Sequence, residues 1–486
     1  MARLIAVVGA GPAGMAAALA AADAGAEVVL VDAAPRVGGQ YHRQPPPGLA
    51  DQHAGPGFAR LEAELAGHPR VRHLAETVVW ALEPRPGGHR LHLRTGPADS
   101  PHRTARVLDP AALVLATGAH DRALPFPGWD LPGVVTAGAA QALAKGQRVA
   151  VGRRVLLAGT GPFLFPVAQS LIEVGAHLVG VLEANRVGAT AAGWLARPAA
   201  LLAGRAKLPE LAGYLGLLAR HRIAYRTGHA VLAAHGTDRV EAVTTARLTR
   251  DWRVVPGSAR RIAVDAVCVG FGFTPQLELA VAAGCDLDAT GTCVRVDIAQ
   301  ATSTPGVFAA GELTGVGGAD LAAAEGRVAG ASAARHLGLA VPVPRAALRQ
   351  VRAGRGFAAA LAGAYPVRPG WRSWLTEDTL VCRCEEVSYG ALCQAVRQRA
   401  ALGGRVLRLT SRVGLGPCQG RICGRNAAEL AEALLCRADQ RPPLTPAASA
   451  RRPIAAPIRL GELATTPTEP SEHGFASTDP TDRSEA

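Results

Sequence analysis

Short apolar runs, each followed by a glycine turn and a helical pattern, organise the first part of the chain. An apolar run covers residues 4–8, a glycine turn residues 9–14 and a helical pattern residues 15–24. A second apolar run follows at residues 26–31. A strand, a tight turn, a helix and a second strand in this order predict that the chain opens on a βαβ unit.

The same order returns about 150 residues later. Its apolar runs lie at residues 154–158 and 177–182, with a glycine turn at 159–161 and a helical pattern at 166–173. Two such openings predict two nucleotide folds in one chain, related as a distant internal repeat.

The remaining segments complete this plan. Apolar runs at residues 262–269 and 306–310 are predicted to be strands that return to the first sheet, and residues 319–337 to be a helix. Residues 341–375 contain several prolines and are predicted to be a connection. A small cysteine-rich segment follows at residues 380–436.

Composition limits the class of protein. With 486 residues, 49% of them apolar and 19% charged, the chain has the balance of a globular enzyme of two to four domains. The formal net charge is +13, but Lys145 and Lys207 are the only lysines, and the arginines are scattered from Arg3 to Arg483. Because no dense basic run occurs, nucleic acid is not expected as a partner.

No targeting segment is recognised. The apolar residues 4–10 run into a glycine turn instead of a cleavage site, and the Ala-rich residues 13–26 are too short and too often interrupted to span a bilayer. A cytoplasmic location and no membrane span are therefore expected. In a reducing compartment, nine cysteines indicate metal ligands or buried thiols before disulfides.

The first glycine turn has the spacing of a dinucleotide-binding fingerprint. Gly9, Gly11 and Gly14 follow a strand and open a helix, and Asp32 ends the next strand. The first glycine permits the tight turn, the second allows a pyrophosphate to approach the backbone, and the third lets helix and strand pack closely. A carboxylate at Asp32 can accept hydrogen bonds from a ribose.

The second glycine turn departs from this fingerprint. Leu164 stands where the third glycine is expected, and Pro162 and Phe163 add bulk at the phosphate approach, although Glu183 ends the next strand. This unit therefore binds NAD(P), binds another adenine nucleotide, or serves as structure alone.

Four cysteines form two close pairs, Cys382 with Cys384 and Cys418 with Cys423. Two irons, each held by one pair, suit this arrangement. Zinc prefers Cys-x-x-Cys knuckles, and a one-residue gap is cramped for two ligands of one tetrahedral ion. Zinc and plain structural thiols remain as alternatives.

The chain resembles the pyridine-nucleotide-disulfide-reductase-like flavoproteins, which have two dinucleotide domains. The resemblance rests on Gly38-Gly39-Gln40, on the apolar strand that ends in Thr117-Gly118, and on Gly311-Glu312, where Asp is the commoner second residue. It implies FAD at the first site. The expected cofactor-binding residues are Gly9, Gly11, Pro12, Ala13, Gly14, Asp32, Gly39, Gln40, Thr117, Gly118, Gly311 and Glu312. No redox Cys-x-x-Cys is present, which excludes a disulfide-reductase mechanism.

The cysteine-rich segment resembles the bacterioferritin-associated-ferredoxin-like (BFD-like) 2Fe-2S domain, although its second pair is spaced by four residues rather than two. The resemblance implies that Cys382, Cys384, Cys418 and Cys423 hold a 2Fe-2S cluster. The expected fold is therefore α/β, with two Rossmann-like domains of the glutathione-reductase type and a small helical 2Fe-2S-binding domain. The expected domains are an FAD-binding domain (1–120 and 261–340), a degenerate NAD(P)-type domain (121–260), a linker (341–376), the cluster domain (377–440) and a Pro-rich, partly disordered tail (441–486).

This combination resembles the larger subunits of octopine and nopaline oxidases, the B subunits of hydrogen cyanide synthases, and the α-subunits of hydroxyproline and proline dehydrogenases. The runs at residues 315–321, 410–423 and 452–464 carry the likeness. It implies an electron-transfer subunit whose partner, a smaller flavoprotein resembling D-amino-acid oxidase, oxidises an amine, amino acid or opine. No catalytic residue is assigned. The alternatives are a self-contained NAD(P)H-dependent reductase and a non-enzymatic scaffold with a zinc module.

Overall fold

The first apolar run forms the central strand of a parallel sheet. In the computed structural model it is β1 (Leu4–Val8), between β2 (Glu27–Val31) and β7 (Ala112–Leu115). The outer strands are β3 (Val71–Leu74) and β18 (Val307–Ala309), which gives the order β18-β7-β1-β2-β3. All five strands are parallel, so their carboxyl ends meet at one edge of the sheet. The structure describes residues 4–46, 48, 56–198, 200, 204–398, 403–435, 451, 452 and 454–465.

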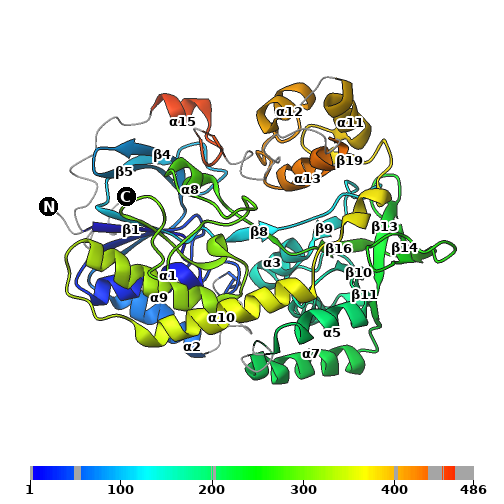
Figure 1. Cartoon of the computed structure of the whole chain (residues 1–486), viewed down its shortest axis with the longest axis horizontal. Helices are drawn as coiled ribbons and strands as arrows, with labels where there is room; N and C mark the ends of the chain where they lie inside the picture. The colour runs from blue at the N-terminus through cyan, green and yellow to red at the C-terminus, as the bar shows by residue number, and fades with distance from the viewer. Residues whose placement is uncertain are drawn as a thin grey trace.

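Helices α1 (Pro12–Asp23) and α9 (Ala319–His336) pack together on one face of this sheet (Figure 1). Small residues bring the two backbones close. A Cβ at Gly326 would lie 2.0 Å from the carbonyl oxygen of Ala13, and one at Gly330 would lie 2.2 Å from that of Ala17. The C-terminal helix of this unit, α9, is thus fixed against α1.

The opposite face is covered by a three-stranded antiparallel sheet of β4 (Thr77–Arg85), β5 (Gly88–Thr95) and β6 (Thr104–Leu108). Helix α8 (Glu278–Ala282) packs beside β4. Helix α2 (Pro56–Gly67) contacts α1 and β3. Because both faces of the parallel sheet are buried, β1, β2, β7 and β18 read as nearly continuous apolar runs, whereas the edge strand β3 contains Arg72 and His73.

The second glycine-turn pattern also opens a parallel sheet. Its strands are β9 (Val134–Thr136), β10 (Arg154–Gly159), β11 (His177–Glu183), β12 (Tyr225–Thr227) and β16 (Ala266–Gly270). They lie in the order β12-β11-β10-β16-β9. The predicted second α/β unit is therefore present.

The predicted strand over residues 262–269 is wrong in both extent and partner. Two strands form there, and the first, β15 (Arg260–Ala263), joins β13 (His229–His235) and β14 (Ala242–Arg247) in an antiparallel sheet. The second, β16, pairs with β10 and β9 of the second parallel sheet. Of the two predicted returning strands, only β18 joins the first sheet.

The helices of the second unit are α3 (Ala137–Gln147), α4 (Leu164–Glu173), α5 (Val187–Leu195), the 3-10 turn η1 (Gly204–Lys207) and α7 (Leu208–Arg220). The buried side chains of α3, α4 and α7 pack on one face of its sheet, and the β13–β15 sheet packs on the other. Figure 1 shows α5 and α7 at the lower right, far from the small helical domain at the top.

Two short strands connect the units. β8 (Ala119–Asp121) leaves the first sheet and pairs antiparallel with β17 (Phe273–Pro275), which leaves the second. The 3-10 turn η2 (Gly311–Thr314) lies beside β17. The carboxyl edges of both sheets are therefore joined by this crossover.

The predicted connection contains a long helix, α10 (Arg345–Ala364), and the 3-10 turn η3 (Pro369–Trp374). α10 contacts α9 of the first unit and α5 of the second. It therefore bridges the two units. None of the helices in the described part of the chain is both long enough and apolar enough to span a bilayer.

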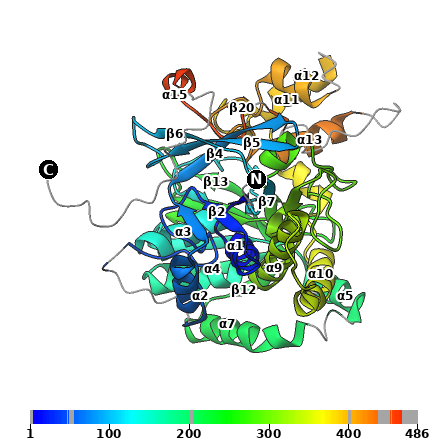
Figure 2. The same cartoon turned by 90° about the vertical axis from the view of Figure 1, so that its left-hand side faces the viewer.

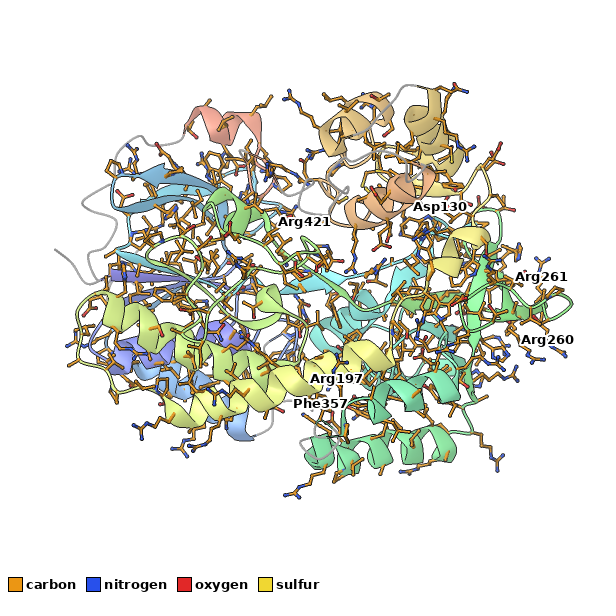
Figure 3. The ribbon with its side chains drawn as sticks, viewed as in Figure 1. Asp130, Arg197, Arg260, Arg261, Phe357 and Arg421 are labelled. Atoms are coloured by element: carbon orange, nitrogen blue, oxygen red, sulfur yellow. The ribbon has the colours of Figure 1, made fainter. Side chains whose placement is uncertain are left out.

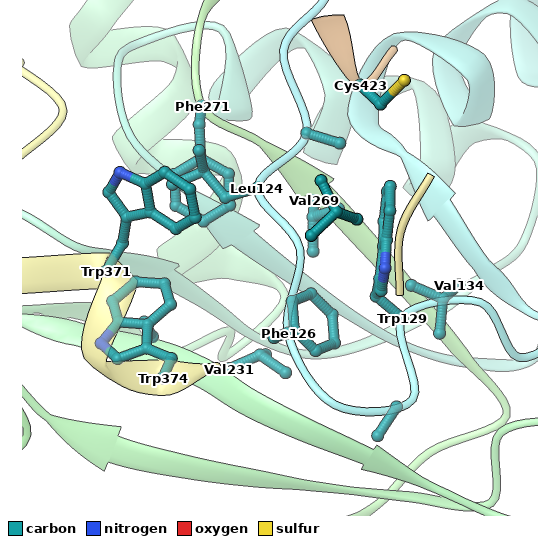
Figure 4. Packing of buried hydrophobic residues seen from close by; sticks show 14 of the residues in the cluster. Leu124, Phe126, Trp129, Val134, Val231, Val269, Phe271, Trp371, Trp374 and Cys423 are labelled. Atoms are coloured by element: carbon teal, nitrogen blue, oxygen red, sulfur yellow. The ribbon is translucent and has the colours of Figure 1, made fainter. Parts of the chain in front are cut away.

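A small domain follows, with the hairpin β19 (Leu380–Cys382) and β20 (Val387–Ser388) and the helices α11 (Tyr389–Gln398), α12 (Gly404–Ser411) and α13 (Gly424–Leu434). Its core is continuous with that of the second unit. Figure 4 shows Cys423 near Trp129, with Trp371 and Trp374 in the same cluster. The indole N–H of Trp129 donates to the carbonyl oxygen of Leu380 at 2.6 Å.

The segment after this domain packs on the β4–β6 sheet and ends in α15 (Leu460–Ala464), as Figure 2 shows. The amide of Ala455 donates to the carbonyl oxygen of Trp80 at 2.7 Å. Arg103 and Glu462, both buried, form an ion pair at 2.6 Å. Of the predicted tail (441–486), the structure describes residues 451, 452 and 454–465, and the rest of that prediction lies outside the described residues.

Candidate functional site

Three glycines shape the turn between β1 and α1. Gly9 has φ +104°, and a Cβ there would lie 2.2 Å from the carbonyl oxygen of Ala116. A Cβ at Gly14 would lie 1.7 Å from the carbonyl oxygen of Gly9, whereas nothing lies within 4 Å of a Cβ at Gly11. Gly9 and Gly14 therefore allow close backbone packing, and Gly11 leaves an open face.

The start of α1 offers unpaired donors beside this open face. Gly11 is the N-cap residue and Pro12 the first helical residue. The amides of Ala13 and Gly14, in the first turn, have no acceptor within the helix. No acidic side chain lies in this turn. Such a helix end suits an anionic group like a pyrophosphate.

Asp32 is held at the end of β2 beside this turn. Its Oδ2 accepts from the amide of Ala10 at 2.5 Å, and its Oδ1 accepts from the amide of Ala34 at 2.7 Å. A carboxylate oxygen has more than one lone pair, so each can accept a further hydrogen bond from a ribose hydroxyl.

The glycine pair after Asp32 packs against the turn that contains Gly11. Gly39 has φ +60°, and a Cβ there would lie 2.9 Å from the Cα of Gly11. The amide of Gly38 donates to the carbonyl oxygen of Ala10 at 2.8 Å. Gln40 is exposed, and its Oε1 accepts from Arg43 at 3.1 Å. The structure therefore brings Gly39 to the open face, while the Gln40 side chain is engaged by Arg43.

Thr117 and Gly118 lie where the chain leaves the first sheet for β8. The hydroxyl of Thr117 donates to the carbonyl oxygen of Gln276 at 3.0 Å. Gly118 has φ +72°, with nothing within 4 Å of a Cβ. This strand end is thus a second open position at the same edge of the sheet.

The turn after β18 closes over the start of α1. Gly311 has φ +79°, and a Cβ there would lie 2.9 Å from the Cβ of Ala13. Glu312 is turned toward its own loop, where it accepts from the amide of Gly318 at 3.1 Å. Burial raises the pKa of the Glu312 carboxyl, and the backbone hydrogen bonds from Gly318 and Gly317 act against this rise.

Glu325 fixes this turn through contacts whose partners the sequence does not specify. Its buried carboxylate accepts from the amide of Gly311 at 2.9 Å and from the hydroxyl of Thr314 at 2.8 Å. Arg355 on α10 pairs with the same carboxylate at 2.9 Å. No local pattern reveals this contact, because its members come from three separate elements.

The four cysteines of the two predicted pairs are brought together. Cys423 is hydrogen-bonded to Cys382 and to Cys418, and Cys418 also to Cys384. The sulfurs thus form a chain of contacts in the order 384, 418, 423, 382. Among the described residues, no three His, Cys, Asp or Glu side chains surround a single point as ligands of one ion.

Hydrogen bonds lower the pKa of two of these thiols. For Cys418 the bond from Cys423 acts most strongly and, with backbone amides of Gly420 and Ile422, lowers the pKa to about 4. The bond from Cys423 also lowers the pKa of Cys382 to about 6. Burial raises the pKa of Cys384, and the two neighbouring sulfurs raise that of Cys423. Backbone N–H groups directed at sulfur suit thiolate ligands.

The cysteine loop contacts the crossover directly. His120 on β8 lies with its Nε2 2.6 Å from the carbonyl oxygen of Arg421, between Cys418 and Cys423. Figure 3 labels Arg421 at this junction. The amide side chain of Asn426 donates to the carbonyl oxygen of Ala123 at 2.6 Å. The strand β8, which begins directly after the open position of Gly118, therefore contacts the cysteine loop.

A family model described as pyridine nucleotide-disulphide oxidoreductase matches residues 3–338. The chain belongs to this family. It is 32% identical over 482 residues to the A subunit of opine oxidase from Agrobacterium tumefaciens (strain Ach5), covering 95% of this chain and 91% of that protein. It is 34% identical over 442 residues to the HcnB subunit of hydrogen cyanide synthase from Pseudomonas protegens, covering 86% and 89%.

Among solved structures, L-proline dehydrogenase from P. horikoshii is similar, with a TM-score of 0.64 and 19% identity over 94% of this chain and 78% of that chain. At this identity the likeness shows the fold. Together the matches confirm the predicted family and an FAD-dependent oxidoreductase.

Within the fold of this family, the second nucleotide unit of the chain differs from the first. α4 begins at Leu164, three residues after Gly161, whereas α1 begins directly after Gly11. The amides of Leu164 and Phe165 donate to the carbonyl oxygens of Gly161 and Pro162. The backbone amides that have no partner at the start of α1 therefore correspond, in the second unit, to amides that are hydrogen-bonded within the turn.

The carboxylate of Glu183 is also engaged. It is buried, and it accepts from the hydroxyl of Thr160 at 2.7 Å and from the amides of Gly161 and Asn185 at 2.8 and 2.7 Å. Asn185 in turn donates to Thr160 and to the carbonyl oxygen of Pro366 in the predicted linker. The chain's own connection thus reaches the strand end where a ribose would bind.

Proposed function

We propose that this FAD-dependent oxidoreductase is the electron-transfer component of a heteromeric enzyme that oxidises an amine, amino acid or opine. Electrons would pass between FAD at the first nucleotide fold and a 2Fe-2S cluster at the cysteine loop. The observation that carries the proposal is the contact between His120 and Arg421 at 2.6 Å, because it joins the two candidate sites through one short strand.

The residues of the first fold fit FAD. The amides at the start of α1 would hold the pyrophosphate over the open face of Gly11, and Asp32 would hold the ribose. Gly118 and the turn fixed by Glu325 would border the rest of the cofactor. A bound flavin can accept two electrons together, as a hydride, and release them one at a time.

The cysteine loop fits a two-iron cluster. Cys382 with Cys384 and Cys418 with Cys423 offer two sulfurs for each iron, and the lowered pKa values of Cys418 and Cys382 favour the thiolates that bind metal. Backbone amides of Gly414 and Gly420 would remain directed at the sulfurs. No catalytic acid or base is assigned to this chain, because in this proposal the partner oxidises the substrate and this chain passes on the electrons.

The partner is inferred from the relatives. The opine oxidase and hydrogen cyanide synthase proteins that match are, by name, subunits of larger enzymes, and this chain covers about nine-tenths of each. The proposed partner is a smaller flavoprotein resembling D-amino-acid oxidase, which would oxidise the substrate and deliver electrons to this chain.

Metal analysis tests the cluster. The anaerobically purified chain is expected to contain about two irons and two acid-labile sulfides per chain and to give an EPR signal after dithionite. Cys418→Ser is expected to lose iron, whereas Cys393→Ser, in the same domain but outside the sulfur chain, is expected to keep it. A zinc-containing protein without sulfide would refute the cluster.

Anaerobic mixing with NADH or NADPH separates this proposal from a self-contained reductase. The late start of α4 and the complete burial of Glu183 favour no bleaching of the flavin. Rapid bleaching by either nucleotide would support the reductase. Oxidation of an amino acid or opine by the lone chain would contradict the need for a partner.

A further inference from the structure

The cluster domain has an uneven distribution of charge. From Val387 to Ala428 the chain contains seven arginines and no Asp or Glu. The arginines are Arg397, Arg399, Arg405, Arg408, Arg412, Arg421 and Arg425. Thiolate-bound iron is anionic, so some of these cations are expected to balance the cluster itself.

The inward arginines are already matched. Arg421 pairs with Glu278 at 3.0 Å, and Arg425 pairs with Glu429 at 3.2 Å. Arg405 and Arg412 lie on α12 and just after it, toward solvent. Arg412 pairs with Glu385 at 2.6 Å, and its side chain is still largely exposed.

Large apolar side chains are exposed beside these two arginines. Leu409 is 65% exposed, Val406 46% and Leu415 40%. Val406 and Leu409 are three residues apart on α12, so they share one side of the helix. We call the surface formed by Arg405, Val406, Leu409, Arg412 and Leu415 the α12 face. In both Figure 1 and Figure 2, α12 lies on the outer side of the molecule, away from the sheets.

This face borders the cysteines. A Cβ at Gly416, next to Leu415, would lie 2.3 Å from the Cβ of Cys384. Cys384 is also the one exposed cysteine among the four of the sulfur chain. The α12 face is therefore the apolar surface that lies where a cluster would come nearest to solvent.

We propose that the α12 face docks an acidic one-electron carrier protein, which takes electrons from the cluster. The inference rests on the proposed function, since it needs a redox centre at these cysteines. Transient electron-transfer complexes use small interfaces, and three apolar residues bordered by cations match that size. An acidic carrier would be attracted by Arg405 and Arg412 before the apolar contacts form.

Charge argues against a second copy of this chain on the same face. The chain has a formal charge of +13, and a symmetric contact would bring Arg405 and Arg412 against the same residues of the copy. Like charges across an interface cost free energy that three apolar side chains do not offset.

Each carrier molecule accepts one electron from the chain. A chain reduced by two electrons would pass one electron to each of two oxidised carrier molecules in succession, release the protons of the reduced flavin to solvent, and return to its oxidised state. In the proposed enzyme the partner flavoprotein supplies these two electrons from the amine. In the test, photoreduced deazaflavin supplies them.

The test uses stopped-flow mixing of the reduced, iron-loaded chain with two probes of opposite charge. The acidic probe is an oxidised blue-copper protein with an acidic surface, and the basic probe is cytochrome c. The acidic probe is expected to be reduced faster, with a rate that falls as salt rises. Arg405→Glu and Leu409→Ser are each expected to slow it about tenfold or more. Arg261→Glu, exposed at the far edge of the second unit in Figure 3, should have no effect.

Iron and sulfide are measured on every sample, so that failure of the proposed function can be distinguished from failure of the docking proposal. A chain without iron fails the proposed function, and the docking proposal falls with it. If the iron-loaded chain reduces both probes at equal rates, or if Arg405→Glu does not change the rate, the docking proposal is overturned and the proposed function is not. A dimer in sedimentation that Leu409→Ser dissociates would likewise overturn it, because a second copy would then cover the α12 face.

Discussion

The guanidinium of Arg122 lies 2.6 Å from the carboxylate of Glu429, although 307 positions separate the two residues along the chain. Arg122 follows β8, and Glu429 lies on α13 beyond the cysteine loop. Burial, together with the neighbouring Arg425, lowers the pKa of Arg122 to about 10, and Glu429 acts against this decrease. The ion pair therefore holds the small domain on the crossover between the two nucleotide folds.

Loss of this pair is expected to loosen the small domain without removing its cysteines. Glu429→Ala leaves a buried guanidinium without its carboxylate, which costs about 1–3 kcal/mol. The expected results are a lower unfolding temperature, earlier tryptic release of the C-terminal domain and unchanged iron content. Glu241→Ala, at an exposed position, is the control. Equal behaviour of the two variants would mean that the Arg122 contact does not hold the domain.

Substitutions at Gly11 and Gly14 are expected to separate cofactor binding from folding. Gly11 has φ −74°, which any residue adopts, and its Cβ would enter open space. Gly11→Ala should therefore change the stability of the FAD-free protein by less than about 0.5 kcal/mol while lowering the flavin content. Gly14→Ala should destabilise the fold itself, because its Cβ would lie 1.7 Å from the carbonyl oxygen of Gly9.

Flavin absorbance per chain and thermal unfolding of the FAD-free proteins measure these two effects. Gly213→Ala serves as the matched control, because this exposed glycine of α7 has nothing within 4 Å of a Cβ. It should stabilise the protein by about 0.5–1 kcal/mol. Full flavin content in Gly11→Ala would show that the open face does not hold the cofactor.

The sequence predicts best what is local. The turn at Gly9, Gly11 and Gly14 with the following Asp32 is specified within a single βαβ unit, so its geometry follows from the spacing. The second unit is recognised in the same way. In both cases the strand, the turn and the helix are neighbours along the chain.

Long-range choices were not predictable in this way. An apolar run does not specify which strand it pairs with, so the prediction assigned β16 to the wrong sheet. Helix α10 contains Gly354 and Gly356 and has no side-chain N-cap, and it is stabilised by packing on α9 and α5. The role of Glu325 depends on Gly311 and Arg355, which approach it only in the folded chain.

The order of thiol reactivity follows from pKa and access in the metal-free protein. Cys418 is half-buried with a pKa lowered to about 4, so at pH 6 it is a thiolate. Cys382 is also acidic but buried, and Cys384 is exposed with a raised pKa. Iodoacetamide at pH 6 is therefore expected to label Cys418 first.

Mass spectrometry of the digested protein measures the labelled fraction at each position. Cys268 is fully buried, and burial raises its pKa to about 12, so it serves as the unreactive control. Bound iron should protect Cys418, and its removal by a chelator should restore labelling. Faster labelling of Cys384 than of Cys418 would contradict the hydrogen-bond chain.

Acid is expected to release the segment that carries α15 before the chain unfolds. The hydrogen bond from Arg103 lowers the pKa of Glu462 from 4.5 to about 2. Because the folded pKa lies below the unfolded value, the ion pair stabilises the docked segment fully above about pH 4.5. This contribution is lost as the pH falls toward 2.

Hydrogen exchange of residues 454–465, corrected for the intrinsic rate at each pH, should show protection falling between about pH 4.5 and pH 2. Glu462→Gln should expose the segment at neutral pH and abolish the dependence. Protection that persists at pH 2, or that is lost above pH 5, would assign the attachment to the other contacts of the segment, which are those of Ala455 with Trp80 and of Arg459 with Asp99 and Ser100.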